Sequence, residues 1–397
     1  MSKNKTKKRK DRIVSPKKDI EIIQFLKKHV KQIDDSYDNK KLSNYIYEKV
    51  VQSKKESSHV FHEQELFDMK PIDCPRGDFF TPNIEKYIND TLHYQYDIRF
   101  TYKHIDFFVH VVFDGTIKIQ KYIDYIKWIV CLCLRDSKNT TKQNIQITLY
   151  LTDLEKAIPS HFQNNVQVEH INSGFSYWNH ELQEKKIYIY RKEEWIKVLI
   201  HECFHMFNMD IPEHIHGNTK QFEELFHIQS DFIINECFVE FWARILNCAL
   251  FTYVLKPDMN TNDFHTLFSL NLNVERLFSL FQACKLLDQF QLTYKDIIDQ
   301  KTKHICKSIY KEDTNAFSYY VLTCILMNSF HKTLEWFDIH NDHLFHFKKT
   351  EAQIQEFCHY IKDLAKEPKL IQLFESLNAG KIKDSNQMKM TIFEITI

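Results

Sequence analysis

The stretch that decides the fold is WIKVLIHECFH (residues 195–205), whose apolar spacing predicts a helix. It contains the pattern His-Glu-x-x-His, with His201 and His205 four residues apart. On a helix this spacing puts both imidazoles on one face, where they can bind a single metal ion. Glu202 then adjoins that metal, where a general base for water is needed. The stretch therefore predicts two metal ligands and a base on one helix.

A second helix offers a third ligand. Zinc hydrolases use three protein ligands and leave one position open for water. The segment NECFVE (residues 235–240) lies in the run 230–250, which is typical of a long, buried helix. Glu236 is the predicted third ligand, and Glu240, one turn later, is predicted to hydrogen-bond the free nitrogen of a ligand histidine. Both carboxylates lie among apolar residues, where an unpartnered carboxylate is costly.

Other arrangements of ligands can be compared with the same residues. A metzincin requires Gly at position 208 and His at position 211, but this chain has Asn208 and Ile211, which excludes that class. Asp210, His214 and His216 remain as alternative third ligands, in a stretch that is typical of a loop.

The residues before the helix predict a β-hairpin. NSGFSYW (residues 172–178) and KIYIYR (residues 186–191) have the composition of strands and are joined by a polar turn. Further strands are expected at 96–102, 107–113 and 145–151, with a helix at 117–134. Nearly everything after Glu193 is expected to be helical. The predicted fold class is therefore α+β, with a small mixed sheet, a backing helix and a helical C-terminal half.

These features resemble a known family. The run from Ile145, the segment Asn172-Ser173-Gly174 and the segment 189–195 with the His-Glu-x-x-His helix are similar to gluzincin-type metallopeptidases of large DNA viruses. The resemblance covers roughly residues 90–330. It implies a zincin-like fold, a zinc cofactor, and a peptide or protein substrate, with His201, His205 and Glu236 as ligands and Glu202 as the base.

The resemblance also implies a substrate site. The first strand of the hairpin would be the exposed edge of the sheet and would bind an extended peptide through Ser173, Gly174 and Phe175. Gly174 would let the substrate backbone approach closely. The alternative is an ordinary hairpin without such a role.

In gluzincins a Tyr or His of the helical half stabilises the oxyanion of the reaction. Tyr319 and Tyr320 are the candidates for this role, and core packing is the alternative for each. Three histidines could take their place: His227, His265 and His304.

Five regions are expected: a basic disordered tail at 1–18, an N-terminal helical region at 19–90, a sheet-bearing zincin subdomain at 91–210, a helical subdomain at 211–340 and a C-terminal helical extension at 341–397. The final residues 390–397 alternate like a strand and are expected to pair with the sheet or with another chain.

Composition limits the possible partners and location. The formal net charge of the 397 residues is zero, so no overall field favours nucleic acid. The first dozen residues are strongly basic and could bind nucleic acid, contact a nuclear import receptor or be a solvated end. No secretory signal or membrane-spanning run is apparent, and the ten cysteines lack paired zinc spacing. We therefore expect an intracellular protein of the host cytoplasm, the nucleus or a virion, with no membrane partner.

The sequence leaves two main functional hypotheses. The first is a zinc metallopeptidase that uses Glu202 as general base. The second is a non-enzymatic virion or scaffold protein on a zincin fold. A basic-tailed factor with structural zinc is a third hypothesis, but such zinc sites usually have four protein ligands, and no fourth ligand is apparent.

Overall fold

The computed structural model describes residues 17–29, 40–68, 74–75, 77–135, 137, 142–159, 165–179, 184–212, 219–341, 343–377 and 386–397. Residues 1–16 of the expected basic tail lie outside the described residues. The alternative ligands His214 and His216 do so as well.

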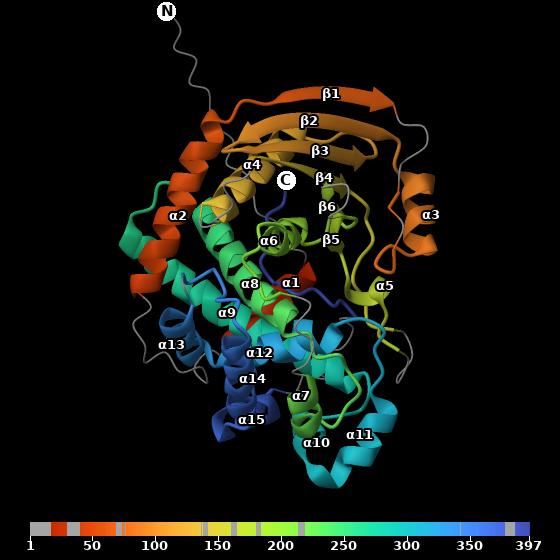
Figure 1. Ribbon diagram of the computed structural model, residues 1–397, viewed down its shortest axis with the longest axis vertical. Coiled ribbons are helices and arrows are strands. Elements are labelled where there is room, and N and C mark those ends of the chain that lie inside the picture. Colours follow the sequence, from red (N-terminus) through yellow and green to blue (C-terminus); the bar gives the residue numbers. More distant parts are fainter. Residues whose placement is uncertain are drawn as a thin grey trace, which may run out of the picture.

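Six strands form one mixed, open sheet in the order β1-β2-β3-β4-β6-β5 (Figure 1). The neighbours β3, β4 and β6 run parallel, while β1, β2 and β5 pair antiparallel with their neighbours. The strands are β1 (Glu63–Asp68), β2 (Tyr94–Tyr102), β3 (Ile105–Phe113), β4 (Gln143–Tyr150), β5 (Gly174–Asn179) and β6 (Glu184–Ile189). The two edges of the described sheet are therefore β1 and β5.

Helices surround the sheet and make up the second half of the chain. Those up to residue 206 are α1 (Lys17–Lys27), α2 (Lys40–His59), α3 (Pro82–Thr91), α4 (Ile119–Leu134), α5 (Val168–Ile171) and α6 (Trp195–Met206). The later ones are α7 (Thr219–Leu225), α8 (Ile234–Leu255), α9 (Thr261–Asp288), α10 (Tyr294–Ile298), η3 (Gln300–Thr302), α11 (Lys303–Ile309), η4 (Ser318–Leu322), α12 (Thr323–Asn328), α13 (Phe330–His340), α14 (Glu351–Ala365) and α15 (Pro368–Ser376).

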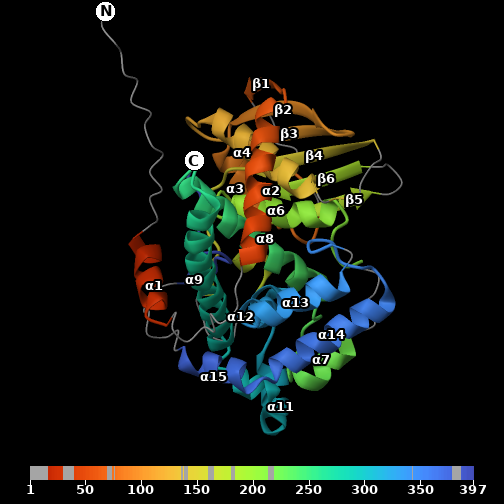
Figure 2. The same ribbon diagram turned by 90° about the vertical axis from the view of Figure 1, so that its left-hand side faces the viewer.

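Alternate residues of the strands face two different layers. On one face, Val109 and Val111 join the main core, to which α2, α4 and α6 contribute. On the other face, Val112 joins a smaller cluster with Ile84 and Ile88 of α3. Figure 1 shows α3 on one side of the sheet with α4 and α6 on the other, and Figure 2 shows the later helices gathered at the end of the molecule away from β1. Both faces of the inner parallel strands are therefore covered.

The predicted fold class is confirmed at this level: a mixed sheet with helices, followed by a helical half. The predicted strands and the backing helix lie within a few residues of β2, β3, β4 and α4. One strand, β1, lies in the region that was expected to be helical. Its residues Glu63 to Phe67 are all exposed, so it lacks the apolar pattern by which a buried strand is recognised.

Helix α8 is long and strongly apolar. Among the described residues it is the one helix long and apolar enough to cross a bilayer. However, 83% of its most apolar window is buried inside the protein, as in the central helix of a folded core.

The C-terminal segment (residues 386–397) is not a strand of the described sheet, so the expected pairing with the sheet is wrong, while pairing with another chain stays a prediction. It lies extended in the interior, and only an isolated bridge between Gln387 and Ala157 resembles strand pairing. Buried side chains satisfy its backbone instead. One carboxylate oxygen of Glu194 accepts hydrogen bonds from the N–H groups of Met390 and Thr391, at 2.6 Å each.

Two more side chains bind the same segment. Glu275 accepts from the N–H of Ile392 at 3.1 Å, and the amide of Asn247 donates to the carbonyl of Phe393 at 2.8 Å. The alternation of residues 390–397 therefore reflects burial on more than one side rather than membership of a sheet.

Loss of the Glu194 charge is expected to destabilise the fold strongly. The second oxygen of Glu194 lies 2.8 Å from Lys156 Nζ, and both side chains are almost fully buried. Glu194→Gln would leave a buried ammonium without its counter-ion, which typically costs about 3–5 kcal/mol. Urea denaturation at neutral pH measures this loss. The control is Glu367→Gln, which removes a more exposed ion pair with Lys332 and should cost less than about 1 kcal/mol.

Candidate metal centre

Helix α6 ends in a turn that brings the chain back toward its own histidines. Asn208 has a positive φ of 58°, which Asn tolerates better than most residues. The N–H of Asn208 donates to the carbonyl of His205, and the N–H of Met209 donates to that of Phe204, each at 3.0 Å. These two bonds form a Schellman motif, and the reversal places Asp210 beside His205.

The first residues of helix α8 lie beside this turn in space. The side chain of Asn235 accepts from the N–H of Ile211 and donates to Asp210 Oδ2, both at 3.2 Å. Asn235 therefore fixes the first turn of α8 against the end of α6. Because α8 then runs back along α6, Glu236 lies next to His201 and His205.

The three predicted ligands converge. His201 Nε2 lies 3.1 Å from both His205 Nε2 and Glu236 Oε2, and His205 Nε2 lies 3.6 Å from Glu236 Oε2. A tetrahedral zinc ion with bonds of about 2.0–2.1 Å places neighbouring ligand atoms about 3.3 Å apart. The spacing and the chemistry of this N₂O set therefore fit a metal ion, and His201, His205 and Glu236 could hold one.

Glu240 supports His201, in the position predicted for it. Its Oε2 lies 3.1 Å from His201 Nδ1, so it accepts from the nitrogen that does not face the other ligands. Glu240 is completely buried and is neutralised by Lys197 at 2.9 Å and by Arg244 at 3.0 Å. The carboxylate therefore fixes the ring and the tautomer of His201 without being an unpaired buried charge.

Asp210 supports His205 in the same way. Its Oδ2 lies 2.7 Å from His205 Nδ1, and Lys349 lies 3.7 Å from its other oxygen. Asp210 was an alternative third ligand, but it contacts the ring nitrogen on the far side from Glu236. It is therefore an orienting carboxylate, and Glu236 is the acid that shares a centre with both histidines.

Neighbouring charges shift the pKa values of His205 and Glu236 in opposite directions. Burial lowers the pKa of His205, but the carboxylates of Glu236 and Asp210 outweigh it and raise that pKa well above its usual value. Burial raises the pKa of Glu236, but His205 and His201 outweigh it and hold that pKa well below its usual range. The centre is thus a strongly polarised group of donors, in which a divalent cation could replace the protons.

Glu202 lies between α6 and the edge of the sheet. Its side chain is buried, and burial raises its pKa while the nearby histidines lower it. The hydroxyl of Ser176 in β5 also hydrogen-bonds Glu202 and lowers the pKa. Ser176 was not predicted as a site residue, although its position two residues after Gly174 puts it on the same face of the strand.

The three predicted substrate residues have different surroundings. Ser173 is buried, and its carbonyl accepts from the N–H of Tyr190 at 2.8 Å, so this group pairs within the protein. Phe175 points to the face opposite α6, where it stacks on Tyr188. Only Gly174 lies on the α6 face, and its lack of a side chain serves packing: an added Cβ would lie 2.7 Å from Tyr188 O.

Gly174→Ala is therefore expected to displace the edge strand. The new methyl group would also lie 2.9 Å from a methyl of Val198 in α6, so both the sheet and the helix oppose it. Overpacking of this kind costs about 1–3 kcal/mol, measured as a shift in urea denaturation. Gly77→Ala is the control, because no atom lies within 4 Å of the added Cβ there. Equal stability of the two variants would contradict this account of Gly174.

The structure separates the two tyrosine candidates. Both belong to the π-helical turn η4, in which the side chains of successive residues diverge. The ring of Tyr319 lies 6.0 Å from that of His201, and nearby Glu236 and Glu202 help burial to raise its pKa. The hydroxyl of Tyr320 instead donates to the carbonyl of Met388, so Tyr320 holds the C-terminal segment and is not available to the centre.

The alternative histidines do not join the centre. His265 hydrogen-bonds Ser43 at 2.7 Å, the N–H of His227 donates to the carbonyl of Ile297, and His304 precedes Cys306 in α11.

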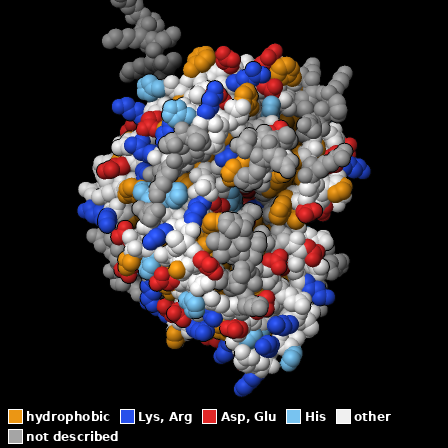
Figure 3. Space-filling model, in the orientation of Figure 1, with side chains coloured by type: hydrophobic (Ala, Val, Ile, Leu, Met, Phe, Trp, Pro, Cys, Tyr) orange, Lys and Arg blue, Asp and Glu red, His pale blue; other side chains and the backbone are white. Residues whose placement is uncertain are grey.

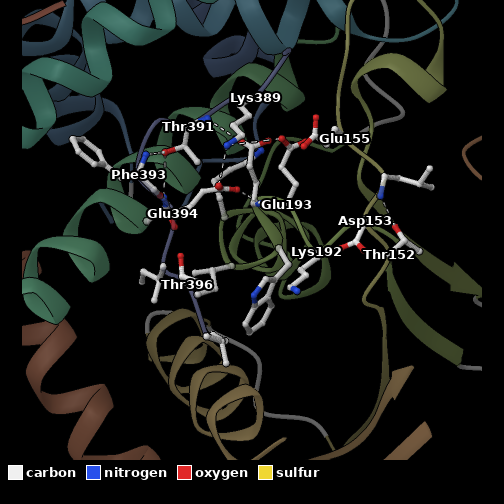
Figure 4. A pocket seen from close by; sticks show the side chains of 18 of the residues that line it. Thr152, Asp153, Glu155, Lys192, Glu193, Lys389, Thr391, Phe393, Glu394 and Thr396 are labelled. Atoms are coloured by element: carbon white, nitrogen blue, oxygen red, sulfur yellow. Dashed lines mark hydrogen bonds and ion pairs between the residues drawn. The ribbon is translucent and has the colours of Figure 1, made fainter. Parts of the chain in front are cut away.

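A cavity of about 540 Å³ lies at the other end of α6, between residues 152–155, 192–197 and the C-terminal segment (Figure 4). None of the three ligands lines it, so it is distinct from the metal centre.

Comparison of the chain with protein-family models, with curated protein sequences and with solved structures gives no match. The geometry of the centre is therefore the basis on which a function can be proposed.

Proposed function

We propose that this chain is a zinc-dependent metallopeptidase with a zincin-like fold of the gluzincin kind. The observation that carries the proposal is the convergence of His201, His205 and Glu236 from two antiparallel helices, with Glu202 beside them. Zinc is the metal that fits best, because two imidazoles and one carboxylate are a common ligand set of catalytic zinc.

The residues of the centre would have separate roles. Zinc, when bound, would supply Lewis-acid chemistry that polarises the scissile carbonyl and activates water. Glu202 would accept a proton from the attacking water and pass it to the leaving amine, which its buried carboxylate is placed to do. Tyr319, with its hydroxyl held protonated, would donate a hydrogen bond to the oxyanion. Glu240 and Asp210 would keep the two imidazoles in orientation.

The edge strand β5 supports a peptide as the substrate. β5 pairs antiparallel with β6 on one side and is the last strand of the described sheet on the other. The bond from Tyr190 to Ser173 sets the register, so that the N–H and C=O groups of Gly174 and Ser176 point away from β6. An extended peptide could pair with them close to Glu202.

The ten free cysteines support an intracellular location for this activity. The experiment that tests the proposal is metal analysis of the purified chain, combined with cleavage of a peptide library. About one zinc per chain and metal-dependent cleavage are expected. A zinc-loaded chain that cleaves no peptide would favour the alternative of a non-enzymatic virion or scaffold protein.

A further inference from the structure

Exposed aromatic side chains gather beside β5. Phe79, just before α3, is 37% exposed, and Tyr177 of β5 is 47% exposed. Phe175, two residues before Tyr177 and on the same face of the strand, is half-buried. The rings of Phe79 and Phe175 stack with centroids 6.1 Å apart. We name Phe79, Phe175 and Tyr177 the aromatic shelf. Figure 3 shows hydrophobic side chains around a hollow near the centre of this face of the molecule.

The shelf rests on a buried base, so its rings are held in place. Phe175 stacks on Tyr188 at 5.2 Å and lies 6.5 Å from Phe80. Phe80 in turn meets Tyr190 edge-on at 5.7 Å, and both are buried. A fixed group of aromatic rings with an exposed rim is typical of a recognition surface rather than of scattered surface residues.

The register of β5 determines which side chains of a bound peptide would contact the aromatic shelf. A peptide that pairs with the outward groups of Gly174 and Ser176 forms a further antiparallel or parallel strand. Side chains of such a strand alternate between the two faces of the sheet. One set would face α6 and Glu202, and the other set would lie over the shelf.

We propose that the aromatic shelf selects peptides with a large apolar side chain at the position next in sequence to the residue that faces Glu202. This inference rests on the proposed function, because it takes β5 to be the substrate strand. The three shelf residues offer apolar faces and no formal charge, so a Phe or Leu side chain gains by leaving water and a charged side chain loses its hydration. The occupant is therefore an extended peptide of alternating character, apolar on the shelf face.

The test measures binding separately from cleavage. In Glu202→Gln, which keeps all three ligands, fluorescence anisotropy gives the Kd of a set of labelled peptides in which one position at a time is Phe, Leu, Ser, Asp or Lys. At one position Phe and Leu are expected to bind about 10–100-fold more tightly than Ser, from burial of one apolar side chain. Phe79→Ala should reduce that preference several-fold, and Phe175→Ala should do the same.

Phe61→Ala is the matched control, because Phe61 is 79% exposed and precedes β1 at the opposite edge of the sheet. It should leave the preference unchanged. Thermal unfolding of each variant shows whether the fold persists; Phe79, at the rim, can be tested even if Phe175→Ala unfolds.

Two outcomes overturn the inference: equal binding of all the peptides, or a preference that persists in Phe79→Ala. Failure of the proposed function is distinguishable from both. If the wild type cleaves nothing but binds apolar peptides through the shelf, the peptidase proposal fails and the shelf remains. If the wild type cleaves peptides without an apolar preference, the peptidase proposal stands and the inference about the shelf fails.

Discussion

Glu202→Gln is expected to reduce peptide hydrolysis about 10²–10⁴-fold, the usual contribution of a general base. The amide keeps the shape of the side chain and its contact with Ser176, but it cannot accept a proton at neutral pH. Zinc content should stay at about one per chain, because Glu202 is not among the converging ligands. Initial rates on the best peptide of a library, with zinc measured on the same sample, give both quantities.

The control for this variant is Glu223→Gln, which changes an exposed glutamate of α7. It should leave both rate and zinc unchanged. If Glu202→Gln keeps full activity, the assigned base is wrong. If the wild type is inactive and Glu202→Gln leaves the biological phenotype intact, the scaffold hypothesis replaces the peptidase.

His201→Ala and His205→Ala are each expected to abolish stable zinc binding. Either change leaves two protein ligands, whereas catalytic zinc sites use three. Zinc per chain, measured by mass spectrometry after dialysis, should fall from about one to near zero. Glu240→Gln should act more weakly, by about 10–100-fold in affinity, because it only orients His201.

His265→Ala is the matched control for these variants, since His265 bonds Ser43 away from the centre. Its zinc content should equal that of the wild type. Retention of zinc in both His201→Ala and His205→Ala would show that the zinc is bound at another site.

The sequence predicted those parts of the structure that depend on local pattern. The α6 helix, the hairpin before it and the helix with Glu236 follow from residue spacing of four and of two. The pair Glu236 and Glu240 was recognisable because one turn of helix separates two acids in an apolar run. In each of these elements, the residues that form the buried face can be recognised from the spacing of apolar residues within one continuous stretch of sequence.

The remaining parts depend on contacts between distant segments. Asp210 becomes an orienting group only because the turn at Asn208 reverses the chain. Lys197 neutralises Glu240 only because α8 packs along α6. Ser173, Gly174 and Phe175 were predicted together as substrate residues and Ser176 was not, because sequence alone did not fix which parity of the strand faces α6. The C-terminal segment was mistaken for a strand because side-chain acceptors such as Glu194 leave no periodic signal.

That segment also bears on when the candidate metal centre can form during synthesis. Glu194 directly precedes α6, and its carboxylate accepts a hydrogen bond from a backbone N–H group 196 residues further along the chain. While the ribosome is still making the helices between them, the start of the helix that carries His201 and His205 lacks these partners. The buried ion pair of Glu194 with Lys156 then lacks the backbone N–H groups that complete its hydrogen bonding. Since contacts of such long range form late in folding, a nascent chain would carry His201 and His205 without a finished centre. The proposed hydrolase, assembled in this order, would stay inactive until its synthesis has passed residue 391.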